Sequence, residues 1–292
     1  MSRILVIRHG AFGDIVLSFA AFAAIRANHA GDEITLLTTK PYAGLLAKSP
    51  WFNHVVVDEK PKAWNLAGLL RLCRVLRGFD MVYDLQTSGR STRYFTLAGR
   101  PPWSGIAPGC RYPDSNPART RLHTRERLAG QLAAAGIAHL PAPDLSWLTG
   151  QPPVLPARYA VFVPGGSAHR PEKRWPAAHF RAVADSLAMD VVVVGTAGER
   201  DLAQTIGGMD LTGRTDIPTL ATVLRGAAFA LGNDTGPMHL AAALGVPCIS
   251  LFSAASDPAL CAPRTPNGGW PEILRAPSLH ALPVAQVQAA LP

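Results

Sequence analysis

The stretch that decides the fold is GNDTGPMHLAAALG, residues 232–245. The apolar run 227–231 just before it predicts a buried strand, and residues 234–236 predict a tight turn of small side chains. Pro237 then opens an alanine-rich helix, because proline is favoured at the first helical position. The other amides of that first turn stay free and carry the positive end of the helix dipole. The stretch therefore predicts an anion site suited to a phosphate-bearing ligand.

The same order of strand, turn and helix recurs along the chain. The 292 residues favour two domains, and the proline-rich segment 140–158 is the expected linker between residues 1–150 and residues 151–292. Alternating strands and helices predict parallel sheets covered by helices. We therefore expect an α/β protein of two Rossmann-like domains whose sheets face each other across a cleft. Ligands in such folds bind beyond the carboxyl ends of the strands.

The alternation of strands and helices leads to three specific predictions about secondary structure. The spacing of apolar residues predicts one helix over residues 14–27. Residues 99–121, rich in Pro, Gly and Arg, predict a long loop. The strand over residues 248–252 is the last element that the second half predicts.

The excess of positive over negative charge lies entirely in the first half. Residues 1–150 hold 18 Lys and Arg against 10 Asp and Glu, whereas residues 151–292 hold 10 of each. Residues 89–127 alone contain eight arginines and two acids. This region is a candidate surface for an anionic partner such as a phosphorylated lipid, a membrane face or nucleic acid. The alternative is an arginine excess that reflects genomic base composition.

Composition also bears on the compartment. No apolar run reaches the roughly 18 residues that a membrane-spanning helix needs. The four cysteines are scattered with no close pair, which favours free thiols in a reducing cytosol over a disulfide framework or a zinc site. We therefore expect a cytoplasmic protein.

The first loop, RHGAFGDIVLS at residues 8–18, carries a candidate catalytic acid. Gly10 and Gly13 let the backbone turn sharply and approach a ligand closely. Asp14 stands at the start of the following helix. It is either an N-cap, which alone explains an aspartate there, or a general base of modest strength that faces the cleft.

A second loop, PGGSAHRPEKRWP at residues 164–176, carries candidate phosphate contacts. Gly165, Gly166 and Ser167 offer amides and a hydroxyl, and Lys173 offers a point charge. The alternative for Lys173 is a solvated loop charge, although no other lysine follows residue 62.

Glu199, in VGTAGERDL at residues 194–202, follows a predicted strand. It is a candidate partner for a ribose diol, as acids after Rossmann strands often are, or an ordinary helix-start acid. The chain lacks the dinucleotide fingerprint, the P-loop and a D-x-D pair for a metal. We therefore expect no metal and no cofactor, and we expect amides, Lys173 and His239 to stabilise a pyrophosphate.

Taken together, four motifs resemble glycosyltransferase family 9, the lipopolysaccharide heptosyltransferases. The resemblance runs along nearly the whole chain, in the order that the family has. The four motifs are IRHGAFGDIVLS (residues 7–18), DLQTSGRSTRYFTLAGRP (residues 84–101), PGGSAHRPEKRWP (residues 164–176) and LGNDTGPMHLAAALGVPCISLF (residues 231–252).

The resemblance implies a GT-B fold, with the acceptor on the first domain and a nucleotide-sugar such as ADP-heptose on the second. It implies inverting transfer to a hydroxyl of the lipopolysaccharide inner core or a similar anionic, lipid-linked glycan, at the inner membrane face. Asp14 matches the catalytic base, and Arg90 and Arg93 are candidate acceptor contacts. The implied donor contacts are Gly13, Gly166, Ser167, Lys173, Glu199, Asp234, Thr235, Gly236 and His239.

Two alternatives from other classes remain open. One is a non-catalytic protein that binds a nucleotide-sugar, and the other is a sugar-nucleotide epimerase of the same architecture. Nucleic-acid binding is not expected, because the basic region lacks the interleaved aromatic residues of a stacking surface.

Overall fold

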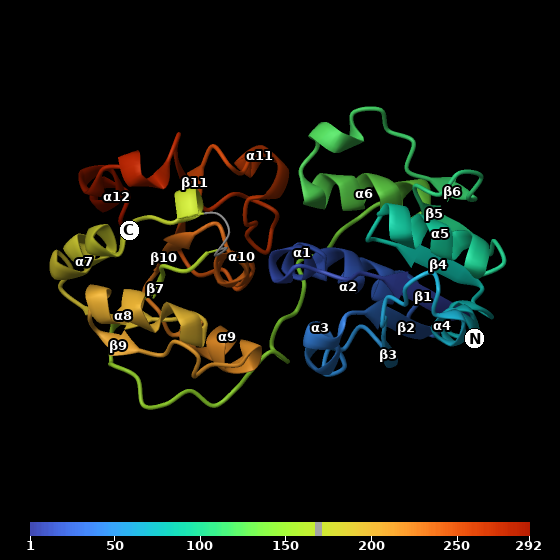
Figure 1. The fold of residues 1–292 in the computed structure, drawn as a ribbon, viewed down its shortest axis with the longest axis horizontal. Helices are drawn as coiled ribbons and strands as arrows, with labels where there is room; N and C mark the ends of the chain where they lie inside the picture. The colour runs from blue at the N-terminus through green and yellow to red at the C-terminus, as the bar shows by residue number, and fades with distance from the viewer. Residues whose placement is uncertain (167–170) are drawn as a thin grey trace. The chain divides into compact units, whose positions relative to one another are not determined.

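The chain folds into two compact units, Met1–Trp147 and Leu148–Pro292 (Figure 1). The computed structural model describes residues 1–166 and 171–292. Each unit is built on a six-stranded sheet in which every recorded strand pairing is parallel, with helices packed on the sheet. The predicted α/β class with parallel sheets is confirmed. The division between the units falls inside the predicted linker 140–158, which contains no helix or strand.

The elements of the first unit are β1 (Arg3–Ile7), α1 (Phe12–Leu17), α2 (Phe19–Asn28), β2 (Glu33–Thr38), α3 (Lys40–Leu46), β3 (His54–Val57), α4 (Leu66–Leu76), β4 (Met81–Asp84), α5 (Gly89–Leu97), β5 (Trp103–Gly105), β6 (Tyr112–Pro113), a 3-10 turn (Arg119–Arg121) and α6 (Thr124–Ala134).

The elements of the second unit are β7 (Tyr159–Val163), a 3-10 turn (Pro171–Lys173), α7 (Ala177–Asp185), β8 (Asp190–Val193), a 3-10 turn (Ala197–Glu199), α8 (Arg200–Ile206), β9 (Met209–Asp210), α9 (Ile217–Arg225), β10 (Ala230–Asn233), α10 (Gly236–Ala243), β11 (Cys248–Ser253), α11 (Pro258–Cys261), β12 (Glu272–Ala276), a 3-10 turn (Leu279–Ala281) and α12 (Val284–Ala289).

Both sheets have the same strand order. The first runs β3-β2-β1-β4-β5-β6, and the second runs β12-β11-β10-β7-β8-β9. Numbered within its own unit, each follows the doubly wound order 3-2-1-4-5-6. The order reverses between β1 and β4 in the first unit and between β7 and β10 in the second. Loops that leave the carboxyl ends of strands at such a reversal form the ligand crevice of open α/β sheets, so the topology points to one site region in each unit.

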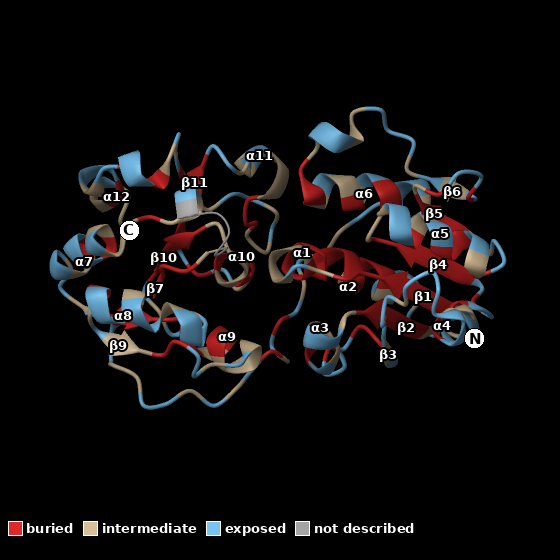
Figure 2. Cartoon of the chain, in the orientation of Figure 1, coloured by how far each residue is buried: buried red, intermediate tan, exposed pale blue. Residues whose placement is uncertain are grey.

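The cores lie against the sheets, as Figure 2 shows by the buried strands and the exposed outer sides of the helices. In the first unit, Leu5 and Ile7 of β1 pack with Leu72 and Leu76 of α4 and with Trp103 of β5. The strands are buried on both faces, which explains why they read as continuous apolar runs in the sequence. The cysteines are free, and no helix in the described residues is both long and apolar enough to cross a membrane.

Two predictions in the first unit are wrong. The single helix over 14–27 is divided into α1 and α2 at Ser18, whose buried hydroxyl donates to Asp14 O at 2.7 Å and so competes with the regular helical hydrogen bonds. The loop over 99–121 contains β5 and β6, which extend the sheet. Strands of two or three residues are too short to show a period-2 pattern in the sequence.

The second unit also differs from the prediction. The strand expected over 227–231 is β10 at Ala230–Asn233, so it includes a glycine and an asparagine. Gly232 is required because a side chain there would meet Val163 Cβ at 2.6 Å and Met238 Sδ at 2.8 Å. Three further elements were not predicted from the sequence, namely α5 in the first unit, and β12 and α12 in the second. The short elements α11 and β9 were missed as well.

Candidate active site

The first loop turns at Gly10, directly after β1. Gly10 has φ of +92°, and a side chain at this position would meet Tyr42 Cε2 at 2.5 Å. Both facts require glycine here. Gly13 does not have a positive φ, because it is the second residue of α1. The expected sharp turn at Gly13 is therefore wrong, and the proposed donor contact of Gly13 stays a prediction.

Asp14 is the third residue of α1 and does not cap it. The N-cap is Ala11, which has no side-chain capping bond, so the alternative explanation of Asp14 as an N-cap is wrong. Its Oδ1 lies 3.1 Å from Arg8 Nη2, and its side chain is 46% exposed. Arg8 is itself buried and donates to Leu85 O at 2.7 Å and to Asp14 O at 3.0 Å. Asp14 is thus held by a fixed guanidinium while its carboxylate stays open to solvent.

Beside this loop lies a buried chain of polar groups, His9–Asp58–Tyr94. His9 Nε2 lies 2.9 Å from Asp58 Oδ2, and Tyr94 Oη donates to the same oxygen at 2.7 Å. Burial alone would raise the pKa of Asp58, but the hydrogen bonds from His9, Tyr94 and Lys60 N outweigh it and hold this pKa below its usual range. These contacts connect the loop after β1 and the loop after β3 to α5.

Asp84 ends β4, next to β1 at the reversal of the strand order. It is fully buried, and Gln86 N and Thr87 N donate to its Oδ1 at 3.1 and 3.0 Å. Burial raises the pKa of this carboxyl to about 6, although these bonds and the Ser91 hydroxyl oppose the shift. The side chain of Asp84 thus fixes the start of the segment that leads into α5.

The expected acceptor contacts Arg90 and Arg93 lie on α5 and are exposed. Both line a pocket of about 460 Å³ together with Leu69, Tyr94 and Leu97. Arg90 also donates to Pro61 O at 3.4 Å. The two guanidinium groups therefore lie beside a largely apolar hollow, and their role as acceptor contacts stays a prediction.

In the second unit, Asp234 is the centre of a compact polar cluster. Its Oδ2 lies 3.2 Å from Lys173 Nζ and accepts from Ser256 Oγ at 2.6 Å, and its Oδ1 lies 3.8 Å from His239 Nε2. Lys173 also donates to Ser256 Oγ. Burial alone would raise the pKa of Asp234, but the neighbouring His239, the hydrogen bond from Ser256 and the charge of Lys173 hold it below its usual range. Residues from three separate loops therefore meet, and they include three of the predicted donor contacts, Lys173, Asp234 and His239.

The helix that follows this cluster, α10, offers fewer free amides than the sequence predicted. Its first residue is Gly236, and Pro237 is the second. Met238 N and His239 N both donate to Thr235 O, at 3.1 and 3.3 Å. The amide of Gly236 is the remaining donor of the first turn, because proline has none. Binding of an anion at this turn would therefore need the side chains of Lys173 and His239 as well as the backbone amides.

Asn233, at the end of β10, holds the surrounding loops in place. It is fully buried, its Nδ2 donates to Pro164 O at 2.8 Å and to Gly165 O at 3.0 Å, and its Oδ1 accepts from Trp175 N at 3.1 Å. The loop 164–166 after β7 is thereby fixed to the end of β10. The signal for Asn233 in the sequence is a polar residue that closes an apolar strand.

Glu199 has a definite structural role. Its Oε2 accepts from Thr196 N at 2.7 Å as part of a capping box, and its Oε1 accepts from Gly166 N at 3.2 Å. The Gly166 amide, expected to face a phosphate, is therefore bonded to Glu199. The ribose role of Glu199 stays a prediction, and Ser167 lies outside the described residues.

Sequence reasoning missed several residues of both regions. They are Arg8, His9, Asp58 and Asp84 in the first unit, and Asn233 and Ser256 in the second. Ser256 gives no local signal, because it stands in an unremarkable loop and reaches the cluster only through the tertiary fold. Within residues 1–166 and 171–292 no group of three or more His, Cys, Asp or Glu side chains is arranged to hold a metal ion.

Comparison with known proteins places this geometry in a family. The sequence profile of the family described as glycosyltransferase family 9 (heptosyltransferase) matches residues 69–270. Lipopolysaccharide heptosyltransferase 1 of Pseudomonas aeruginosa is 27% identical over 282 residues, which cover 86% of this chain and 78% of that protein.

Two solved structures have the same fold. A family 9 glycosyltransferase from Veillonella parvula has a TM-score of 0.78 and 19% identity, over 99% of this chain and 95% of its own. A heptosyltransferase of E. coli with ADP-2-deoxy-2-fluoro heptose has a TM-score of 0.76 and 22% identity, over 98% of both chains. The two parallel α/β units are thus those of the GT-B class. Because the family profile covers more than half of the sequence, the chain belongs to glycosyltransferase family 9, the heptosyltransferases, and is a glycosyltransferase.

Proposed function

We propose that this protein transfers a heptose from ADP-heptose to a hydroxyl of a lipopolysaccharide inner-core acceptor, with inversion at the anomeric carbon. The observation that carries the proposal is the cluster of Lys173 and His239 around Asp234 at the strand reversal of the second unit. The E. coli relative solved with an ADP-heptose analogue supports the choice of donor. Family membership favours transfer over a purely binding role or an epimerase.

The second unit supplies stabilisation of the leaving group. As the anomeric carbon–oxygen bond breaks, negative charge grows on the departing diphosphate. Lys173 is largely buried and fixed by Asp234 and Ser256, so its charge is already in position. Preorganised charge of this kind acts most strongly where the charge develops in the transition state, which lowers the barrier.

The first unit supplies the base. Asp14 takes the proton of the acceptor hydroxyl as that oxygen attacks the anomeric carbon. Arg8 fixes its carboxylate at 3.1 Å without covering it, and the hydroxyl becomes acidic as the new bond forms, so a modest base suffices. Arg90 and Arg93 contact phosphate or acidic sugar of the acceptor on the same unit.

The proposal is tested by donor binding and transfer. Calorimetry should show that ADP binds more tightly than UDP or GDP, and that Lys173→Ala weakens ADP binding about tenfold or more, since a hydrogen bond to a charged group is lost. Arg158→Ala, a basic residue outside the cluster, is the matched control. Transfer from ADP-heptose in EDTA should proceed at the full rate if no metal takes part. Equal binding of the three nucleotides, or unchanged ADP binding by Lys173→Ala, would contradict the assignment.

A further inference from the structure

The first unit carries an exposed apolar surface where the loop after β3 leads into α4. Trp64, Leu66 and Leu70 are 76%, 71% and 60% exposed. Trp64 lies in the loop, and the two leucines are four residues apart on α4, so they share one face of that helix. We call these three residues the apolar ridge. A contiguous exposed apolar patch that is rimmed by polar residues is typical of a site that contacts a protein or a membrane.

The fold does not need the apolar ridge for its own packing. The inner side of α4 is already occupied, because Leu72 and Leu76 are buried in the core of the first unit. Leu66 and Leu70 extend from a different side of the same helix. This second apolar side has no partner among the described residues that would bury it.

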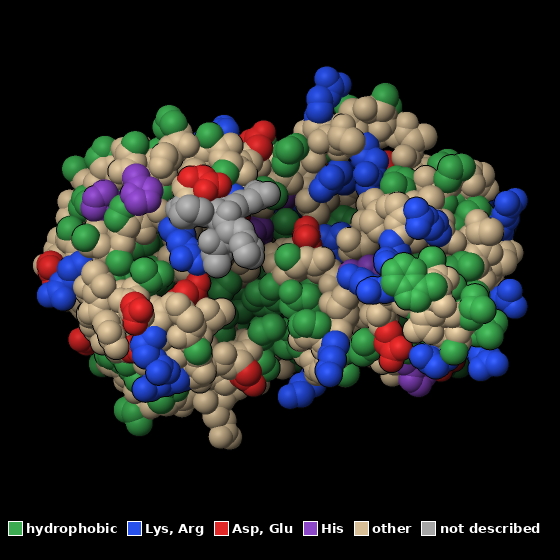
Figure 3. All heavy atoms as spheres, viewed as in Figure 1, with side chains coloured by type: hydrophobic (Ala, Val, Ile, Leu, Met, Phe, Trp, Pro, Cys, Tyr) green, Lys and Arg blue, Asp and Glu red, His purple; other side chains and the backbone are tan. Residues whose placement is uncertain are grey.

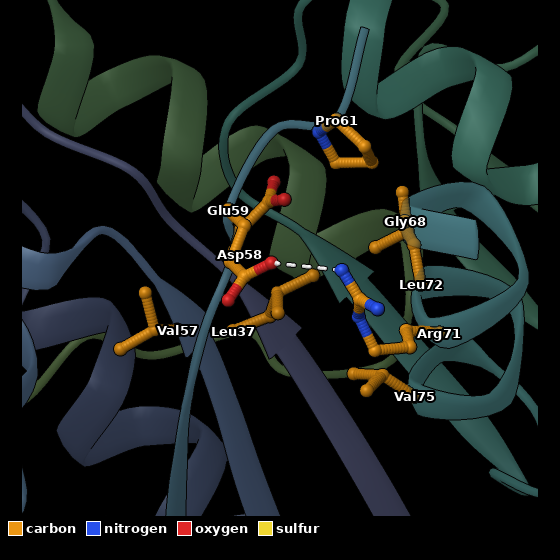
Figure 4. A pocket seen from close by; sticks show the side chains of 9 residues that line it. All are labelled: Leu37, Val57, Asp58, Glu59, Pro61, Gly68, Arg71, Leu72 and Val75. Carbon is orange, nitrogen blue, oxygen red and sulfur yellow. Dashed lines mark ion pairs between the residues drawn. The ribbon is translucent and has the colours of Figure 1, made fainter. Parts of the chain in front are cut away.

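Basic residues border the apolar ridge. Residues 60–77 contain no Asp or Glu and five basic side chains, and Arg90 and Arg93 of α5 add two more. Lys62 Nζ lies 5.1 Å from the centre of the Trp64 ring. The nearest acid in sequence, Glu59, is paired with Arg71 at 3.7 Å (Figure 4). Figure 3 shows Lys and Arg side chains around hydrophobic ones on the first unit.

Pockets continue the apolar surface between α4 and α5. The larger, of about 460 Å³, is lined by Leu69, Leu72 and Leu97, with Arg90 and Arg93 among its remaining walls. The smaller, of about 150 Å³, lies between the β3 end and α4 (Figure 4). An apolar hollow with guanidinium groups in its wall matches an amphiphile with an anionic head.

We propose that the apolar ridge and its basic border dock this protein on an anionic lipid bilayer. Tryptophan and leucine enter the boundary between head groups and acyl chains, while Lys and Arg remain among the negative head groups. A second copy of the chain would bring the same basic border against itself, which like-charge repulsion disfavours. A nucleic acid is not the expected partner, because the apolar ridge has one aromatic ring and two aliphatic side chains and so offers no surface on which successive bases could stack.

The position of this surface connects it to the site. The loop after β3 leaves the carboxyl edge of the first sheet, where Asp58 bonds to His9 and where α1 presents Asp14. A docked bilayer would hold head-group sugars of lipid-linked acceptors at this edge. That consequence rests on the proposed function, whereas the docking itself does not.

The test is co-sedimentation of the full-length protein with vesicles of phosphatidylcholine, with and without phosphatidylglycerol. The wild type should pellet with the anionic vesicles and much less with the neutral ones. Trp64→Ala with Leu66→Ser and Leu70→Ser should weaken that binding about tenfold or more, because the buried apolar area is lost. Lys60→Ser with Lys62→Ser should weaken it and reduce its dependence on salt. Val154→Ser and Trp270→Ala, exposed apolar residues of the second unit, are matched controls and should bind as the wild type does.

Circular dichroism and ADP calorimetry on the same variants separate docking from folding and from donor binding. Lost vesicle binding with wild-type spectra and ADP affinity supports the proposal. Equal pelleting of the ridge variant and the wild type, or equal pelleting on neutral vesicles, would overturn it. The proposal would also be overturned if the wild type did not bind vesicles but formed a dimer that the ridge variant could not form. If the wild type pelleted with anionic vesicles but bound no ADP, the proposed function would fail and the docking surface would stand.

Discussion

At the scale of the residue, Asp14 differs from Asp58 and Asp84, which lie at the same edge of the first sheet. The side chains of Asp58 and Asp84 are fully buried and bonded to protein groups, whereas that of Asp14 is 46% exposed. A general base must reach the proton that it removes. Of the three acids, only Asp14 is both fixed by a partner and open to a ligand.

Asp14→Asn should therefore lower the turnover of heptose transfer about 100-fold or more and leave ADP affinity unchanged. The amide keeps the shape of the side chain and a contact with Arg8, so the loss is chemical and not structural. Single-turnover transfer assays with calorimetry measure the two effects. Asp185→Asn, which removes an exposed acid paired with Arg181, is the matched control. Wild-type turnover in Asp14→Asn would remove Asp14 from the mechanism.

Asp84 makes stability depend on pH. Burial raises its pKa from 3.8 to about 6, so between these values the folded protein keeps a proton that the unfolded chain has lost. The contribution of this group to stability is full below pH 4 and is lost as the pH rises through 6. A shift of this size corresponds to about 3 kcal/mol.

We expect Asp84→Asn to gain up to about 3 kcal/mol in free energy of unfolding relative to the wild type between pH 4 and pH 7, because the amide does not titrate. Urea unfolding at steps across this range measures the difference. Asp80→Asn, an exposed acid of the same unit, is the control. Parallel pH profiles of Asp84→Asn and wild type would contradict the expectation.

At the scale of the element, β10 determines where the turn at residues 234–236 lies. Gly232 allows β10 to approach Val163 and Met238, and Asn233 fastens the loop after β7. The last two residues of one strand therefore position both loops of the second site region.

Gly232→Ala should destabilise the protein by about 1–3 kcal/mol, because the added methyl group meets a packed neighbouring strand that has little room to move. Gly130→Ala, in the middle of α6 with open space around it, should instead be neutral or stabilise by up to about 1 kcal/mol. Chemical unfolding of both variants tests the contrast. Equal effects of the two substitutions would show that β10 is not tightly packed at this point.

At the scale of the whole molecule, the net positive charge lies in the first half of the chain. Residues 1–150 hold 18 Lys and Arg against 10 acids, and residues 151–292 hold equal numbers. This excess of positive charge supports the proposed binding of an anionic acceptor by the first half. The attraction of exposed charges is screened as the Debye length falls from about 10 Å at 0.1 M salt to about 3 Å at 1 M.

The KM for a lipid-linked acceptor should thus rise about tenfold or more over this range of salt. The KM for a short, uncharged acceptor analogue should change little. Steady-state kinetics with both acceptors gives the comparison, and Arg90→Ala with Arg93→Ala should flatten the salt response of the first. A salt response shared by both acceptors would argue against an electrostatic role of the first half.

The sequence by itself determined the fold class and the candidate loops. Buried parallel strands need long apolar runs, and the turns after them need glycine, proline and small polar residues, so β1, β2 and β7 and the motifs after them could be found from local patterns. The family resemblance rests on the same motifs, and comparison with known proteins confirmed it.

Only the tertiary structure decided which side chains meet. Ser256 reaches Asp234 from 22 residues away, and Asp58 joins His9 to Tyr94 across three elements. The Gly166 amide bonds to Glu199, 33 residues further on. The residues that form β10, Ala230–Asn233, were determined by the close packing of Gly232 against Val163 and Met238. The apolar run 227–231 did not predict them. The local sequence pattern indicates which side chains a segment buries. Hydrogen-bond partners, and the space available to a side chain, depend instead on which strands lie side by side. No single segment of the sequence contains that information.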